Sequence, residues 1–278
     1  MKVNDHLINV GVIIPARNEQ DYLKKTLTSL SNQTHTPAQV IVVNDNSIDE
    51  TRNIALEFGC EVLDFPYKHE SWLGDYKLAS VRNLGIVMLD KDLDYILMID
   101  ADHILPHDYI ETMINKMESK PKVVIASGKI DGEWIVSPRG SGRMIKMFYW
   151  KKIGSVYPMN YGFDSYILFK AMQLGYEIEV YPEIITKVQR PTTSNYNTKT
   201  FYSYGKSMQA LGYPMLYAIG RCLVMSKRKG TSCGMAMFKG LMSNHVEKYE
   251  PELREYVKQT HKFTTNHIKR FFEYGFKK

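Results

Sequence analysis

The chain has 278 residues, of which 44% are hydrophobic and 24% charged, and its formal net charge is +6. Such a composition excludes disordered and fibrous proteins, and the length suits one large domain with or without a smaller appendage. The three cysteines, Cys60, Cys222 and Cys233, are widely spaced and odd in number. This usage argues against a disulfide framework or a cysteine metal site and predicts free thiols in the cytoplasm.

The apolar pattern predicts strands and helices that alternate along the first two thirds of the chain. Strands are expected at Val10–Pro15, Gln39–Val43, Val62–Phe65, Tyr95–Ile99, Val123–Ile130 and Ile178–Tyr181. Helices are expected at Gln20–Leu30, Asp49–Phe58, Leu78–Leu89 and His107–Met117. This order predicts an α/β fold of Rossmann-like type, in which helices flank both faces of a mixed, mostly parallel sheet.

The lengths of the apolar runs show whether a signal peptide or a transmembrane helix is to be expected. The first residues, MKVNDHLINVGVIIPARNE, lack the apolar core of a signal peptide, so we expect a strand there. The longest apolar-leaning stretch, Met208 to Met225, is interrupted by Gly212-Tyr213-Pro214 and by Arg221. A spanning helix needs about 20 mostly apolar residues. We therefore expect no transmembrane segment.

Polar side chains follow three of the predicted strands at the point where each strand ends. Arg17 and Glu19 follow the first strand, Asp45 the second, and Asp100 and Asp102 the fourth. Because ligands of parallel sheets bind beyond the carboxyl ends of the strands, these groups are expected along one edge. Two carboxylates one residue apart suit Mg²⁺ or Mn²⁺, whose ligands are oxygens and often include substrate phosphates. The alternative for so short a motif is a solvated turn that caps the next helix.

The last part of the chain differs from the rest in charge. Residues 1–200 carry 22 Lys and Arg against 25 Asp and Glu, whereas residues 201–278 carry 14 against 5. A Pro- and Thr-containing loop after Arg190 marks the boundary, so residues 1–190 are expected to form the first domain. Residues 191–278 are expected to form a mainly helical extension packed on it. Its basic charge indicates an anionic partner or a solvated helical face.

The C-terminal segment THKFTTNHIKRFFEYGFKK mixes aromatic and basic side chains. Such a mixture is typical of a segment that lies on an anionic membrane, although an ordinary docking tail has the same composition. We therefore expect a cytoplasmic protein, either free or held peripherally at the cytoplasmic face of the membrane through its basic C-terminal part.

Five segments, taken in order, resemble the motifs of the family 2 glycosyltransferases, which have the GT-A fold. They are VIIPARNEQDYLKKTLTSLSNQT, VIVVNDNSIDETRNIA, VRNLGI, YILMIDAD and NYGFDSYILFKAMQLGYEI. The resemblance extends to about residue 190 and implies an inverting glycosyltransferase. The implied donor is a nucleoside-diphosphate-sugar of the UDP or GDP type, and the implied acceptor is a saccharide or a polyprenyl phosphate.

The resemblance also implies a pocket for the nucleotide-sugar. Its residues would be Pro15, Arg17, Glu19, Asp45, Arg82 and Asp100. Asp45 would contact the base, and Asp100 would lie by the ribose or the metal. Asn44 stands where many relatives have an Asp, which leaves the preferred base open. Pro15 alternatively only ends a strand, and Arg82 alternatively forms a structural ion pair.

The remaining implied roles concern the metal and the acceptor. Asp102, together with Asp100, would bind Mn²⁺ or Mg²⁺. Asp164 would be the catalytic base, although Phe163 occupies the place of the family's usual Glu and a carboxylate at a helix start is also a good cap. Independently of the resemblance, Arg190 is expected to reach the diphosphate, or an anionic acceptor, from a loop that closes over the site.

Other classes of protein share some of these features. A sugar-phosphate nucleotidyltransferase uses a similar sheet and paired acids, but Pro-Ala-Arg-Asn-Glu stands here in place of its Gly-rich basic loop. A nucleic-acid-binding module is disfavoured because the sequence has no recognisable helix-turn-helix, zinc-finger or aromatic RNA-binding motif, so we expect no nucleic acid partner. A catalytically silent protein of the same fold stays an alternative because of the altered Glu-Asp segment.

Overall fold

The computed structural model describes residues 7–68, 75–133, 137–190 and 197–261. The chain divides into two compact units. The first unit comprises residues 1–69, 80–157 and 174–191, and the second comprises residues 70–79, 158–173 and 192–278. The chain passes from the first unit to the second for the last time after residue 191, close to the boundary predicted at residue 190. The second, helical unit also includes residues 70–79 and 158–173. The domains 1–190 and 191–278 themselves stay a prediction.

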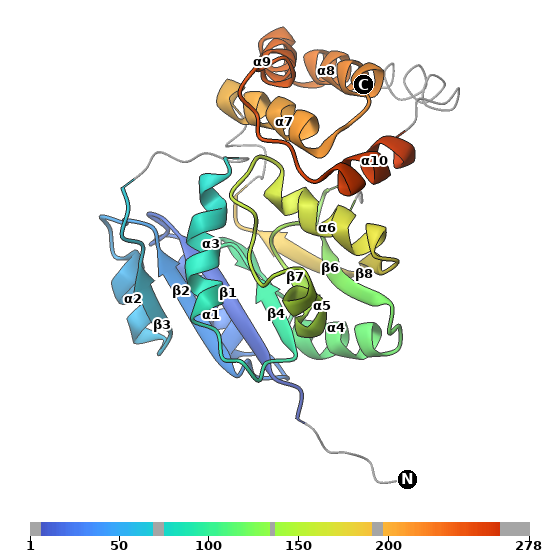
Figure 1. Ribbon diagram of the computed structural model, residues 1–278. Coiled ribbons are helices and arrows are strands. Elements are labelled where there is room, and N and C mark those ends of the chain that lie inside the picture. The colour runs from blue at the N-terminus through green and yellow to red at the C-terminus, as the bar shows by residue number, and fades with distance from the viewer. Residues whose placement is uncertain (1–6, 69–74, 134–136, 191–196, 262–278) are drawn as a thin grey trace. The chain divides into compact units, whose positions relative to one another are not determined.

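A single mixed sheet forms the centre of the first unit (Figure 1). Its strands are β1 (Val10–Ala16), β2 (Gln39–Asn44), β3 (Glu61–Asp64), β4 (Tyr95–Met98), β5 (His103–Ile104), β6 (Val123–Ile130), β7 (Arg143–Lys146) and β8 (Glu177–Val188). Their spatial order is β3-β2-β1-β4-β7-β6-β8-β5. Strands β3, β2, β1 and β4 are mutually parallel, whereas β7 runs antiparallel to both of its neighbours. The predicted mixed, mostly parallel sheet is confirmed.

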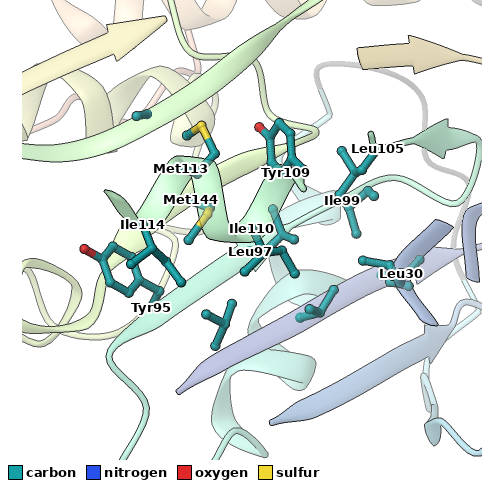
Figure 2. Packing of buried hydrophobic residues seen from close by; sticks show 14 of the residues in the cluster. Leu30, Tyr95, Leu97, Ile99, Leu105, Tyr109, Ile110, Met113, Ile114 and Met144 are labelled. Carbon is teal, nitrogen blue, oxygen red and sulfur yellow. The ribbon is translucent and has the colours of Figure 1, made fainter. Parts of the chain in front are cut away.

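Helices cover both faces of this sheet. On one face, α1 (Leu23–Ser31), α2 (Thr51–Glu57) and α4 (Tyr109–Glu118) share an apolar cluster with alternate residues of β1. Figure 2 shows Ile110 and Met113 of α4 beside Leu97 and Met144 of the sheet. The period of two in a strand places every second residue on this face, so the neighbouring residues of β1 face the opposite layer.

On the opposite face, α3 (Lys77–Val87) approaches β1 and β2 closely through Gly85. A Cβ atom at Gly85 would lie 2.8 Å from Ile13 Cγ2 and 2.9 Å from Val43 Cγ2. Only a residue without a side chain allows this approach, which in turn places Arg82, one helical turn earlier, near the carboxyl ends of the strands. The glycine of VRNLGI therefore has a packing role.

Strand β7 is not predicted by the apolar pattern, and neither is the two-residue β5. All four residues of β7 are buried although it begins with Arg143 and ends with Lys146. The Arg143 side chain donates a hydrogen bond to the Pro138 carbonyl (2.7 Å), and Lys146 Nζ donates to the Met117 carbonyl (3.0 Å). Because these bonds compensate the burial of the two cations, charged residues are tolerated in an interior strand. The pattern of a single sequence does not show which carbonyl groups will lie beside a buried cation. The structure also adds α5 (Met147–Lys152) directly after β7.

The second unit is built of helices. They are α6 (Phe163–Gln173), α7 (Thr198–Leu211), α8 (Met215–Lys229), α9 (Thr231–Leu241) and α10 (Pro251–Thr260). Helices α7 and α9 touch backbone to backbone, because a Cβ on Gly205 would lie 2.0 Å from the Met237 carbonyl oxygen. The predicted helical C-terminal region is confirmed. Within the described ranges, no helix is both long and apolar enough to span a bilayer.

Candidate active site

The carboxyl ends of β2, β1 and β4 meet at one edge of the sheet because these strands are parallel neighbours. Arg17 Nη1 lies 3.6 Å from Asp45 Oδ2, which joins the loops after β1 and β2. Arg82 Nη2, from α3, lies 3.8 Å from Asp100 Oδ1 beyond β4. Pro15 lies at the end of β1, in register with Val43. The structure therefore gathers these predicted residues within the first unit.

Hydrogen bonds between the loops after β1 and β2 hold their shape. Asn18 has a φ of 54°, a left-handed conformation that asparagine tolerates better than most residues. Its amide donates to Ser47 Oγ (3.0 Å), and its side-chain oxygen accepts from the Ile48 amide (2.9 Å). The Glu19 amide donates to Thr51 Oγ1 at 2.7 Å. The Asn-Glu pair of the opening motif is thus tied to the second motif by hydrogen bonds between main-chain amides and side-chain oxygens.

The departure at Asn44 has a physical reason. Asn44 Nδ2 donates to Asp64 Oδ1 (2.8 Å), while its Oδ1 accepts from the Ser47 amide (3.2 Å). The hydrogen bond from Asn44 is the largest influence on Asp64 and lowers the pKa of that carboxyl. An aspartate at position 44 would lack the amide donor and would face a second carboxylate. The preferred base stays open.

The Asp-Ala-Asp turn after β4 is fixed through its main chain. The Asp100 amide donates to Ser141 Oγ (2.8 Å), and the Ala101 carbonyl accepts from Thr26 Oγ1 (2.7 Å). The Asp102 carbonyl accepts from the main-chain amide of Gln189 (2.8 Å). His103 Nδ1 lies 2.6 Å from the same serine oxygen. Burial lowers the pKa of His103 to about 4, which keeps the imidazole neutral. Two side chains and one main-chain amide, from three distant segments, therefore orient the two aspartates.

None of these supporting residues is predicted from the sequence. Ser141, Thr26 and Gln189 are common polar residues that lie far along the chain from the Asp-x-Asp motif. His103 directly follows the motif, but a lone histidine is indistinguishable from an ordinary core residue. Only the folded backbone brings them to the turn.

Arg190 links the ends of β1, β4 and β8. Its Nε donates to Asp102 Oδ2 at 2.7 Å, and its Nη2 donates to Glu19 Oε1 at 2.5 Å. The guanidinium carbon lies 4.9 Å from the centre of the Tyr22 ring. Burial raises the pKa of Glu19, the Asp102 and Asp100 carboxylates add to that rise, and Arg190 opposes it. Three predicted residues thus meet in one ion-paired cluster.

The acids at this edge fit a hard divalent cation. Asp100 and Asp102 supply carboxylate oxygens, the donors that Mg²⁺ and Mn²⁺ prefer. Glu19 Oε2 is buried without a hydrogen-bond partner, and the Arg190 guanidinium already places positive charge between Glu19 and Asp102. Among the described residues, no three His, Cys, Asp or Glu side chains gather as a complete metal site. Two carboxylates leave most of the coordination positions of Mg²⁺ or Mn²⁺ to substrate phosphates and water.

Asp164 belongs to the second unit and lies in the first turn of α6. Phe163, which takes the place of the expected Glu, is 4% exposed and begins the same helix. Burial explains why an apolar residue stands at this position. The role of Asp164 as a catalytic base stays a prediction.

The sheet with its acidic edge defines a structural class that has many solved members. The mannosyltransferase PcManGT from Pyrobaculum calidifontis, solved with GDP-Man and Mn²⁺, matches over 90% of this chain and 68% of its own, with a TM-score of 0.59 and 15% identity. S. aureus TarS 1–349, solved with UDP-GlcNAc, matches over 71% of this chain and 65% of its own, with a TM-score of 0.53 and 15% identity. These similarities show that the fold is of the GT-A type.

Sequence comparison narrows the class to a family. The family model for glycosyl transferase family 2 matches residues 11–174, so the chain belongs to that family. Glycosyltransferase GlyA of Streptococcus pneumoniae serotype 4 is 32% identical over 108 residues, which are 39% of this chain and 15% of that protein. The chain thus matches only a small part of that relative's length. The predicted family and fold are both confirmed.

Proposed function

We propose that this chain is an inverting glycosyltransferase that moves a sugar from a nucleoside-diphosphate-sugar to an acceptor hydroxyl or a lipid phosphate. The observation that carries the proposal is the cluster of Glu19, Asp102 and Arg190 at the carboxyl edge of a family 2 sheet. The donor class is supported by structural neighbours solved with GDP-Man and with UDP-GlcNAc.

The donor would bind along the ends of β1, β2 and β4. Pro15, Arg17 and Glu19 would line the pocket, and Asp45, which is 3% exposed, would contact the base. Arg82, whose Nη2 lies 3.8 Å from Asp100 Oδ1, would support the base or the acids, and Asp100 would lie by the ribose or the metal. The interlocked loops and the fixed Asp-Ala-Asp turn would keep this pocket in shape before the donor arrives, which reduces the entropic cost of binding.

Asp102 with Asp100 would hold Mn²⁺ or Mg²⁺, and a bound ion would supply stabilisation of the negative charge that grows on the departing diphosphate. Arg190 would act in the same direction from its place beside Asp102. A planar guanidinium suits this task because it donates to two oxygens at once.

Asp164 would complete the reaction on the acceptor side. It would accept the proton of the acceptor hydroxyl as that oxygen attacks the anomeric carbon from the side opposite the diphosphate. The new glycosidic bond forms while the bond to the diphosphate breaks, so the anomeric configuration is inverted. A polyprenyl phosphate is already anionic, and with such an acceptor Asp164 would only position it.

A peripheral membrane contact belongs to the same proposal. A lipid-phosphate acceptor would be reached at a membrane surface, and the last 78 residues are strongly basic, with 14 Lys and Arg against 5 Asp and Glu. Most of the aromatic and basic C-terminal segment singled out from the sequence, residues 262–278, lies outside the described part of the chain.

Two substitutions test the proposed reaction, with sugar transfer or donor hydrolysis as the readout. Asp102→Asn is expected to abolish the metal-dependent rate. Asp164→Asn is expected to lower kcat by about 10²- to 10⁴-fold while donor affinity is unchanged, as for loss of a general base. Asp131→Asn, at an exposed position, is the matched control and is expected to behave as the wild type.

Three outcomes would contradict the proposal. Undiminished turnover of the Asp102 variant would remove the metal role. Release of pyrophosphate from a nucleoside triphosphate and a sugar phosphate would identify a nucleotidyltransferase. Donor binding without turnover, whatever acceptor class is supplied, would identify a silent binding protein.

A further inference from the structure

Helices α8 and α9 each expose a stripe of apolar side chains. On α8, Leu216 and Leu223 are 69% and 56% exposed and lie seven residues apart, hence on one face of the helix. Ala218 and Cys222 are buried on another face. A helix of a globular protein normally turns its apolar stripe to the core, so a second apolar face on α8 requires an explanation.

Helix α9 repeats this arrangement. Its large exposed side chains are Met235 and Phe238, followed by Met242 one residue beyond the helix. Their spacing of three and four residues places them on one face. The buried residues Gly234, Met237, Gly240 and Leu241 face elsewhere. Figure 1 shows α8 and α9 as neighbours, and Gly234 of α9 packs directly against the Cys222 carbonyl of α8.

The charged residues in this part of the chain are all basic. Residues 197–246 of the second unit contain seven Lys and Arg and no Asp or Glu. Lys227 lies four residues after Leu223 on the same face of α8, and exposed Arg228 and Lys229 end the helix. Exposed Lys239 adjoins Phe238 on α9. A solvated surface normally carries both signs interspersed, so a run of one sign favours a negatively charged partner.

We infer that the exposed faces of α8 and α9 bind a membrane surface that contains anionic lipids. Apolar side chains flanked by cations match an interfacial helix, whose apolar face enters the acyl boundary while its lysines reach the lipid phosphates. A nucleic acid would satisfy the cations but not the exposed Leu, Met and Phe side chains. This inference rests on the peripheral contact in the proposed function and assigns that contact to α8 and α9.

The test is co-sedimentation of the full chain, without donor or metal, with vesicles of phosphatidylcholine alone or mixed with phosphatidylglycerol. We expect sedimentation only with the mixed vesicles, weakened by added salt because the charges are screened. Leu216→Glu/Leu223→Glu is expected to lower the partition coefficient by at least about tenfold. Lys227→Gln/Arg228→Gln/Lys229→Gln is expected to lower it by roughly fivefold for each charge removed.

Matched controls come from the first unit. Val87 and Leu56 are 70% and 47% exposed, so Val87→Glu/Leu56→Glu adds the same charges at positions of similar exposure. Lys24→Gln/Lys25→Gln/Lys122→Gln removes three exposed cations. Both control variants are expected to sediment as the wild type does. Circular dichroism verifies that each variant is folded.

The inference is overturned if the α8 variants sediment as the wild type does, or if the wild type ignores anionic vesicles. It is also overturned if Lys269→Gln/Arg270→Gln alone abolishes sedimentation, which would assign the contact to the C-terminal segment. A dimer that Leu216→Glu dissociates, in a chain that binds no vesicles, would assign the apolar faces to a second copy. Because no sugar transfer is measured, each result is independent of the proposed chemistry.

Discussion

At the scale of single residues, the site is organised around one arginine. Arg190 touches carboxylates that follow two different strands, and its own side chain is 31% exposed. Removing one partner from a pair that is mostly buried leaves uncompensated charge, which costs more than the loss of an exposed ion pair. Arg190 therefore stabilises the fold of the site as well as its charge.

Arg190→Gln is expected to lower the free energy of unfolding by about 2 kcal/mol, below the full cost of a buried pair because solvent reaches the guanidinium. Arg190→Lys retains the charge but loses the two-pronged geometry, so a smaller loss is expected. Arg52→Gln is the control, because the Arg52–Asp64 pair is about half exposed on both sides. Urea denaturation measures all three, and equal stability of the Arg190 and Arg52 variants would contradict this role.

At the scale of elements, the close approach of α3 to the sheet places Arg82. Gly85→Ala inserts a Cβ atom within 3 Å of the Ile13 and Val43 side chains, so a loss of about 1–3 kcal/mol is expected from overpacking. Gly220→Ala, in α8, meets no atom within 4 Å and is expected to gain up to about 1 kcal/mol from helix propensity. Thermal denaturation of both variants checks the opposite signs, and two losses of equal size would contradict the packing argument.

Helix α10 is held to α6 by an ion pair in the second unit. Lys170 Nζ lies 2.7 Å from Glu250 Oε1, and the Tyr166 hydroxyl donates to the same oxygen at 3.2 Å. Burial acts to raise the pKa of Glu250, but the hydrogen bonds and the charge of Lys170 outweigh it, so the pKa is lowered from 4.5. The ionised carboxylate therefore stabilises the folded chain.

Because the folded-state pKa of Glu250 is the lower one, its contribution is complete above the unfolded value of 4.5 and is lost as pH falls through the folded value. Glu250→Gln is expected to cost about 1 kcal/mol at pH 7, with the difference from the wild type disappearing in acid. Urea denaturation across this pH range measures it. A difference that persists at the acid end would point to packing instead of charge.

At the scale of the whole molecule, a nucleotide that binds only the folded chain must raise its apparent stability. A ligand at one hundred times its Kd adds about 2.7 kcal/mol. A panel of nucleoside diphosphates with Mn²⁺ is therefore expected to raise Tm most for the natural base, and the Asp102→Asn variant is expected to lose the part that depends on metal. Identical shifts for every base, or none, would contradict a nucleotide pocket at the sheet edge.

Much of the fold is readable from local pattern. Strands β1, β2, β4 and β6 are apolar runs that need burial on both faces, and the helices between them show the apolar spacing of helical periodicity. Strand β7 cannot be predicted in this way, because its buried charges have partners that only folding brings close, among them the Pro138 and Met117 carbonyls and the Glu118 carboxylate. Strand β8 is longer than its apolar core, since its pairing with β6 continues past an irregularity after Gly128.

The family, the α/β order and the acids at the sheet edge could be predicted from the amino-acid sequence, because motifs and periodicity are local properties of a chain. The folded chain was needed to show that Arg190 lies between Glu19 and Asp102 and that Ser141, Thr26 and Gln189 hold the Asp-Ala-Asp turn. It was also needed to show that α8 and α9 expose second apolar faces. Hydrogen bonds and burial join residues far apart in sequence. Their partners are therefore settled by the packing of the chain, and no single segment encodes them.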